Sequence, residues 1–195
     1  YSVIKQLFLQ NLMNCALIAL LDEDQIKMMH NPKEIMKRNH ESVQNFQVMQ
    51  DRKGIVVGVI NDKAIFIHQT FAEYFAAVWF SENFDCNLNC FKEIYISRKF
   101  QMIRIFFDRI LSKSFHLHTA VLNHDKGSIE KVFLVKDVNA NEIDDGGRTA
   151  LHLAISNFLD KNPEEENHLN TINSDIIRML LENGVDSGIE DKVLY

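Results

Sequence analysis

The sequence predicts a mainly α-helical fold that contains one small β-hairpin and ends in a repeated pair of helices. Along most of the chain, apolar residues recur at the spacing of amphipathic helices. The exception lies between residues 54 and 68, where two β-branched runs flank the polar segment Asn61–Lys63. The sequence Leu-His-Thr-Ala at 117–120 recurs 34 residues later as Leu-His-Leu-Ala at 151–154, which indicates an α-solenoid.

The composition is that of a globular chain. Its 195 residues are 46% hydrophobic and 25% charged, which excludes a disordered polymer or a collagen. A net charge of −6 disfavours binding of nucleic acid or of an anionic membrane by bulk charge. Three scattered cysteines indicate free thiols, so we expect a cytoplasmic location. The apolar run Leu12–Leu21 is too short to span a bilayer, and we expect the chain to be an internal piece of a longer protein.

The first part of the chain predicts three helices. Apolar residues at helical spacing extend from Val3 to Leu21. The acidic run Asp22–Asp24 opens a short second helix, because carboxylates favour the positive end of a helix dipole. His30–Asn31 ends that helix, and Pro32 suits the first turn of a third helix with a weak apolar stripe.

The hairpin is predicted from Gly54–Ile60 and Ala64–His68, with Asn61–Lys63 as its loop. Thr70 and Glu73 are spaced as a capping box, in which each side chain bonds the other residue's backbone N–H at the start of a helix. One face of that helix is apolar and predicts a core contact. It comprises Phe71, Tyr74, Phe75, Val78 and Trp79.

Beyond this helix, the polar residues 81–88 predict a loop. Apolar residues at helical spacing then predict one helix around Phe91–Tyr95 and a clearer one from Phe100 to Ser112.

The repeated segment resembles ankyrin repeats, whose period is about 33 residues. Gly147 suits a tight turn, Thr149 suits the N-cap of the next helix, and Gly184 suits the left-handed position after a helix. The first copy departs from the family pattern, because Phe115 stands where the family has threonine and its second helix, 129–134, lacks a terminal glycine. A degenerate first copy is typical of a capping repeat.

The ankyrin resemblance implies structural roles for His118 and His152, since in that family the imidazole bonds backbone in the neighbouring turn. In the second copy, residues 160–173 stand between the helices and predict a solvated loop. The stripe of Ile176, Ile177 and Leu180 lies at the end of the array, so we expect it to be partly uncovered.

Residues 66–77, Phe-Ile-His-Gln-Thr-Phe-Ala-Glu-Tyr-Phe-Ala-Ala, resemble a segment of the NACHT-type STAND nucleotide switches, a class that includes the NOD-like immune receptors. In these proteins the segment closes a winged-helix domain that follows a P-loop ATPase module. Joined to ankyrin repeats, the arrangement is similar to large NACHT–ankyrin proteins of arthropods. The resemblance implies that His68 contacts the β-phosphate of bound ADP in the intact protein and stabilises the closed, inactive form.

These patterns predict a winged-helix-like regulatory domain at 1–80, a helical linker at 81–112 and about two ankyrin repeats at 113–195. The expected function is a non-catalytic, protein-binding part of a signalling switch. One partner would be a protein that binds the ankyrin repeats. The other would be the nucleotide-binding domain of the same polypeptide, which would hold any ATP or ADP. No P-loop motif occurs in the chain, so we expect it to be no enzyme and to have no catalytic residue and no cofactor of its own.

The residues also allow three alternatives. The chain could be a plain ankyrin scaffold or adaptor without a nucleotide switch, in which case His68 is only structural. DNA binding by the winged-helix-like part is disfavoured, because the candidate reading helix, 71–80, contains no lysine or arginine. A zinc site at Cys86 and Cys90 is disfavoured because no second ligand pair has compatible spacing, and we expect no bound metal.

Overall fold

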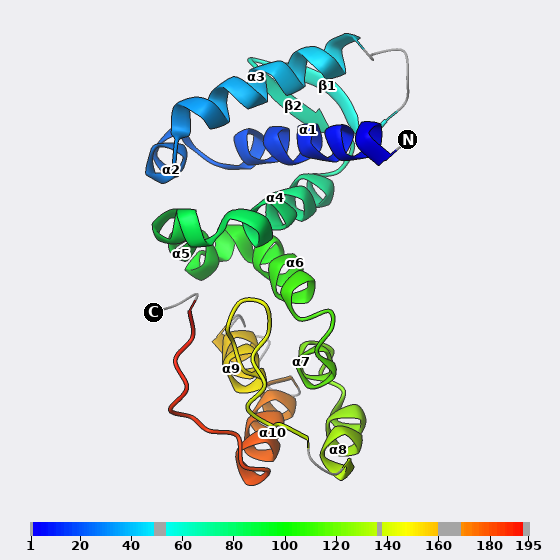
Figure 1. Ribbon diagram of the computed structural model, residues 1–195, viewed down its shortest axis with the longest axis vertical. Coiled ribbons are helices and arrows are strands. Elements are labelled where there is room, and N and C mark those ends of the chain that lie inside the picture. Colours follow the sequence, from blue (N-terminus) through cyan, green and yellow to red (C-terminus); the bar gives the residue numbers. More distant parts are fainter. Residues whose placement is uncertain (1, 49–53, 136–137, 160–168, 193–195) are drawn as a thin grey trace. The chain divides into compact units, whose positions relative to one another are not determined.

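The computed structural model describes residues 2–48, 54–135, 138–159 and 169–192 (Figure 1). The described chain is mainly helical, with one two-stranded antiparallel sheet, which confirms the mainly α class. The chain divides into two compact units, residues 1–107 and residues 108–195, called here unit 1 and unit 2. The division falls within the helix Gln101–Leu111.

Unit 1 begins with the three predicted helices, α1 (Ser2–Leu20), α2 (Glu23–Met28) and α3 (Pro32–Val48). Asp22 caps α2 by accepting from the Gln25 N–H at 3.0 Å, and the Gln25 side chain accepts from the Asp22 N–H in return. This reciprocal cap explains how α2 forms with only six residues.

Helix α1 is long and apolar enough to cross a membrane, by length and composition, over Val3–Leu20. Of this stretch 44% is buried, and the buried part includes Leu12 and Leu17, while Val3 and Ile4 near its start are exposed. Core helices of soluble proteins and signal sequences meet the same criterion. From Leu12 onward, α1 packs as a core helix against α3 and α4.

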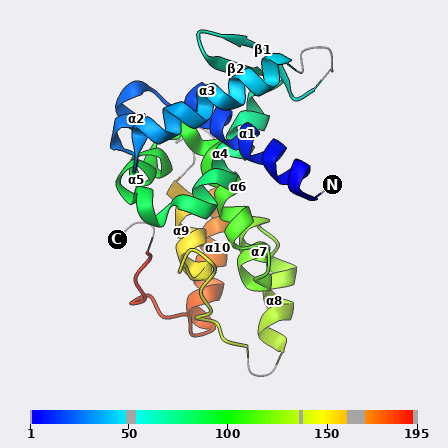
Figure 2. The ribbon, with the colours of Figure 1, turned by 45° about the horizontal axis from the view of Figure 1, so that its top comes forward.

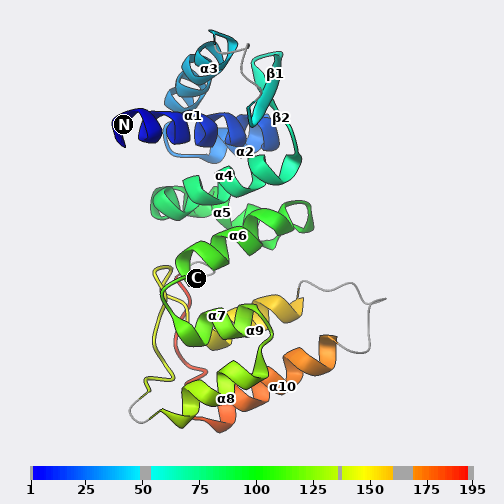
Figure 3. The same ribbon diagram turned by 90° about the vertical axis from the view of Figure 1, so that its right-hand side faces the viewer.

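The predicted hairpin is confirmed as β1 (Val56–Ile60) and β2 (Lys63–Phe66). Asn61 and Asp62 both have positive φ, 51° and 58°, as a two-residue type I′ turn requires. The loop is therefore one residue shorter than predicted, because Lys63 pairs with Ile60 in the ladder. The hairpin packs against α1 and α3 (Figure 3).

The rest of unit 1 is α4 (Gln69–Asn83), a 3₁₀ turn (Asp85–Asn87), α5 (Leu88–Ile96), a second 3₁₀ turn (Arg98–Phe100) and the start of α6 (Gln101–Leu111). The loop predicted at 81–88 is therefore wrong.

Two buried side chains explain the difference. The Phe84 ring packs 5.7 Å from the Phe107 ring, centroid to centroid, in the core of unit 1. Asn87 is buried as well, and its side-chain oxygen accepts from the His30 N–H at 2.7 Å. These tertiary contacts keep a segment with a mostly polar sequence in helical turns.

The described part of unit 2 comprises two helix pairs, α7 (His116–Leu122) with α8 (Lys126–Leu134), and α9 (Ala150–Leu159) with α10 (Leu169–Glu182). Helices α9 and α10 lie side by side, and α7 packs against both α8 and α9 (Figures 2 and 3). Apolar residues from all four helices form one core. Its fully enclosed members are Ile129, Ala150, Leu153 and Leu180.

Two expectations about α10 are corrected. Ile176 and Leu180 are 1% and 0% exposed, so the stripe is covered within unit 2, and only Ile177 remains partly exposed. The helix begins at Leu169, so the end of the predicted loop 160–173 is helical, while residues 160–168 lie outside the described residues.

The two predicted glycine positions are confirmed, since Gly147 and Gly184 have φ of 74° and 82°. Gly146 is constrained differently, by space. A Cβ there would lie 2.8 Å from Leu111 Cδ1 and 3.2 Å from Asp144 Oδ1. These neighbours are buried, so a side chain at this position would have to displace them.

Gly146→Ala should therefore lower the free energy of unfolding by about 1–3 kcal/mol, because the added methyl group overpacks a buried turn. Urea titration measures the change. Gly127→Ala, in the first turn of α8, is the matched control: its Cβ would be 3.6 Å from the nearest atom, and it should be neutral or stabilise by up to about 1 kcal/mol. Equal losses in both variants would contradict the steric explanation.

Candidate functional site

The segment 66–77 runs from the end of β2 into α4. The predicted apolar face of α4 is confirmed in part, because Phe75 and Trp79 are buried. Ala72, Phe75 and Ala76 are buried. Phe71 and Tyr74 are 41% and 42% exposed and lie at the margin of the buried face. The core contact of α4 is therefore rotated towards its alanines, which allow α1 to pack closely against it.

His68 is the N-cap residue of α4. Its backbone is extended (φ −147°, ψ 141°), and its Nδ1 accepts from the Thr70 N–H at 3.2 Å. The predicted capping box of Thr70 and Glu73 is therefore wrong, because the helix starts at Gln69 and Thr70 lies inside its first turn. Glu73 instead accepts from Gln69 Nε2 at 2.9 Å. A hydroxyl followed by a glutamate is the commoner sequence signal for a helix start, and here an imidazole nitrogen supplies the cap.

The cap determines which edge of the His68 ring can act outside the helix. A neutral imidazole that accepts at Nδ1 carries its proton on Nε2. The side chain of His68 is exposed. Its Nε2–H is thus a hydrogen-bond donor on the surface of unit 1, held in orientation by the cap.

Cys86 and Cys90 lie in different surroundings. Cys86 is exposed, whereas Cys90 is buried and its Sγ donates to the Gln25 carbonyl oxygen at 3.3 Å. Burial, with help from nearby Glu93 and Asp22, raises the pKa of the Cys90 thiol to about 12, so the thiolate that a metal requires is disfavoured. Among the residues that the structure describes, no three His, Cys, Asp or Glu side chains form a group that could hold a metal ion.

Unit 2 is organised around Arg148, whose side chain is fully buried. Its Nη2 donates to Asp144 Oδ2 at 2.7 Å, and its Nη1 forms an ion pair with Asp108. Asp144 also accepts from the Ser112 hydroxyl at 2.9 Å and from the N–H of Gly146 at 2.9 Å. Burial alone would raise the pKa of Asp144, but the guanidinium and the hydrogen bonds outweigh it and lower that pKa.

His118 joins this cluster through the backbone. Its Nε2 donates to the Arg148 carbonyl oxygen at 2.8 Å, which confirms the expected bond to the neighbouring turn. In the second repeat, His152 Nδ1 accepts from the Thr149 N–H at 3.0 Å and lies 2.8 Å from the Thr149 hydroxyl. Thr149 thus stands just before α9 as predicted, with its hydroxyl directed at the histidine.

The corresponding nitrogen of His118 has no such partner. Phe115 occupies the position of Thr149, and its ring lies 5.3 Å from the His118 ring. Nδ1 of His118 is buried and accepts no hydrogen bond within the described part of the chain. Burial lowers the pKa of His118, although the Arg148 carbonyl and the charges of Asp144 and Glu142 oppose this effect.

Comparisons of the chain with protein-family models, with curated proteins and with solved structures gave no match.

Removing the buried cation should destabilise unit 2 strongly. Arg148→Met leaves Asp144 and Asp108 buried without their counter-ion, and we expect a loss of about 3–5 kcal/mol in the free energy of unfolding. Arg178→Met is the matched control, because Arg178 pairs with Asp175 at the surface and should cost less than about 1 kcal/mol. Urea titration measures both losses. Similar losses in the two variants would show that the buried cluster contributes no more to the free energy of unfolding than a surface ion pair does.

The stability of unit 2 should fall as the pH drops below about 6.5. The folded pKa of His118 lies below the value of 6.5 for the unfolded residue, so the unfolded state binds more protons. The contribution is complete above pH 6.5 and is lost as the pH falls through 6.5 towards the folded pKa. The lowered pKa of Asp144 acts in a separate window, below about pH 3.8.

His118→Gln tests this, because the glutamine amide can still donate to the Arg148 carbonyl oxygen but does not titrate. Its unfolding free energy should change less between pH 7.5 and pH 5 than that of the wild type. His116→Gln, an exposed neighbour, should keep the wild-type profile. A profile unchanged by His118→Gln would assign the pH dependence to other groups.

Proposed function

We propose that the chain is a non-catalytic regulatory and protein-binding part of a STAND nucleotide-switch protein. In this proposal residues 1–80 are a winged-helix-like domain, 81–112 a helical connection and 113–195 ankyrin repeats. The order of elements in unit 1, helices followed by a hairpin and a further helix, is compatible with a winged-helix arrangement. The sequence similarity at 66–77 supports the assignment to the STAND class.

The repeated helix pairs support the ankyrin part of the proposal. Gly147, in the turn before α9, and Gly184, after α10, both have the positive φ expected of the repeat. His118, within α7, makes the expected bond to the Arg148 carbonyl oxygen in the turn before α9. A solenoid of this kind offers an extended surface without reactive groups, which suits protein binding in the cytoplasm. The partner would then be a protein held by unit 2.

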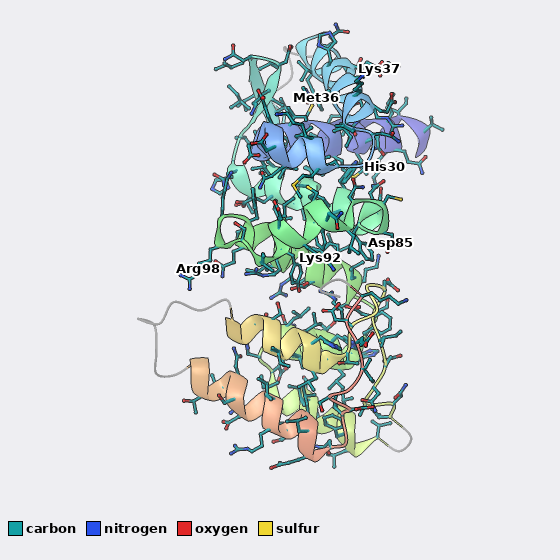
Figure 4. The ribbon with its side chains drawn as sticks, turned by 90° about the vertical axis from the view of Figure 1, so that its left-hand side faces the viewer. His30, Met36, Lys37, Asp85, Lys92 and Arg98 are labelled. Atoms are coloured by element: carbon teal, nitrogen blue, oxygen red, sulfur yellow. The ribbon has the colours of Figure 1, made fainter. Side chains whose placement is uncertain are left out.

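The candidate reading helix of unit 1 disfavours nucleic acid, because residues 71–80 contain no lysine or arginine. The basic side chains Lys37, Lys92 and Arg98 project from α3, α5 and the turn before α6, and Asp85 lies on the same face (Figure 4). Nucleic-acid-binding domains concentrate their lysines and arginines on one patch or stripe, whereas these three come from separate elements and share their face with a carboxylate. A DNA-binding winged helix is therefore disfavoured.

The observation that carries the switch proposal is the orientation of His68. Its cap on α4 leaves Nε2–H at the surface, where it can donate to a phosphate oxygen of ADP bound to the nucleotide-binding domain. Such a bond, made only in the closed state, would shift the closed–open equilibrium towards closed. The cap keeps the ring oriented for this bond.

The same observation favours one alternative, an ankyrin scaffold without a switch. His68 already has a structural role, since it satisfies a backbone N–H at the start of α4. In a plain scaffold, capping α4 would be the whole role of His68. The two functions differ in whether removal of the ring affects anything except helix stability.

Two substitutions at His68 separate the functions in the full-length protein. His68→Asn keeps a side-chain acceptor at the N-cap, whereas His68→Ala removes it. Only the alanine variant should therefore have a lower melting temperature, because the lost cap lowers the free energy of unfolding by about 1 kcal/mol. If His68 contacts ADP, both variants should release ADP faster than the wild type, as followed by retention of labelled nucleotide. ADP release that is unchanged in the asparagine variant, or a reading frame that encodes no P-loop, would leave the scaffold as the function.

A further inference from the structure

Unit 1 contains a pocket of about 370 Å³ between the end of α1, strand β2, the first turns of α4 and the turn before α6. Small-molecule sites in proteins occupy roughly 300–1,000 Å³, so its size is sufficient for a small ligand. Leu20, Phe66 and Phe100 provide apolar walls. Three polar side chains complete the lining: Gln69, Glu73 and Lys99.

Glu73 is the unusual member, because its side chain belongs to a residue only 8% exposed. One neutral donor, Gln69 Nε2, contacts it at 2.9 Å. No basic group lies within 4.0 Å of it among the described residues. A carboxylate that is largely removed from water gains most from a cationic partner, which also supplies hydrogen bonds. The chain leaves room for that partner in the pocket.

Lys99 supplies the opposite charge at the same pocket. Its Nζ lies 4.7 Å from the centroid of the Phe100 ring, and its side chain is exposed. Although both line the pocket, Lys99 and Glu73 form no ion pair in the described structure. The site therefore presents one anion and one cation as separate binding groups. A ligand that carries a single charge would meet attraction from one group and repulsion from the other.

We propose that this pocket binds a small zwitterion with an apolar side group, such as a free α-amino acid of the size of leucine. The ligand's ammonium group would pair with Glu73 and its carboxylate with Lys99. Its side group would pack against Phe66 and Phe100. This binding site does not depend on the nucleotide switch, because it uses neither His68 nor a nucleotide.

Isothermal titration of the whole chain tests the site, with L-leucine as the probe. Two analogues each lack one charge: isoamylamine has no carboxylate, and 4-methylpentanoate has no ammonium group. Leucine should bind saturably, and each analogue about tenfold more weakly or worse, because each loses one charge-assisted contact. Glu73→Gln and Lys99→Gln should each weaken leucine binding by a similar factor. Glu82→Gln, an exposed carboxylate on the same helix, should bind as the wild type does.

Circular dichroism of each variant checks that it is folded. Lys99 is exposed, so Lys99→Gln should fold and still test the site even if Glu73→Gln unfolds unit 1. Absence of leucine binding up to about 20 mM would overturn the proposal. Binding of isoamylamine as tight as that of leucine would overturn the zwitterion in favour of a simple cation. Leucine binding that Lys99→Gln leaves unchanged would show that the ligand's carboxylate is not recognised here.

Discussion

The buried side chain of Arg148 is the constraint on which unit 2 depends. A guanidinium without water needs counter-ions and acceptors, and Asp144 and Asp108 supply them from the turn before α9 and from α6. The backbone carbonyl of the same residue accepts from His118 on α7. One residue therefore ties three segments together. Because an incomplete cluster would leave a buried charge unpaired, the turn that carries Asp144 and the helix end that carries Asp108 must both be in place.

The two helix pairs of unit 2 show how one scaffold tolerates a local change. In the second pair, Thr149 satisfies the histidine that follows it. In the first pair, Phe115 replaces the hydroxyl with a ring that packs against His118, and one nitrogen is left without a partner. An apolar contact stands in place of a hydrogen bond. As a result, His118 Nδ1 is buried without a partner, and protonating it costs free energy. The first repeat is thus distinct in chemistry as well as in sequence.

Unit 1 concentrates its polar chemistry at the junction of β2 and α4. Within six residues, His68 caps the helix, Gln69 bonds Glu73, and Glu73 faces a pocket. The start of a helix favours such a cluster, because its free N–H groups orient side chains and its first turn is not yet covered by packing. The proposed phosphate contact and the proposed zwitterion pocket use different residues of this junction, so each can be tested without the other.

Sequence alone determined the features that depend on local geometry. The hairpin around Asn61 and Asp62 and the left-handed glycine at Gly184 follow from backbone sterics, and most of the helices follow from apolar spacing. Only the tertiary structure decided the rest. It made His68 the cap, kept the polar segment around Asn87 helical, and buried Arg148 in its cluster. Each of these depends on a partner distant in the chain or on competition between neighbouring caps, and spacing along a sequence carries no information about which contact is lower in free energy.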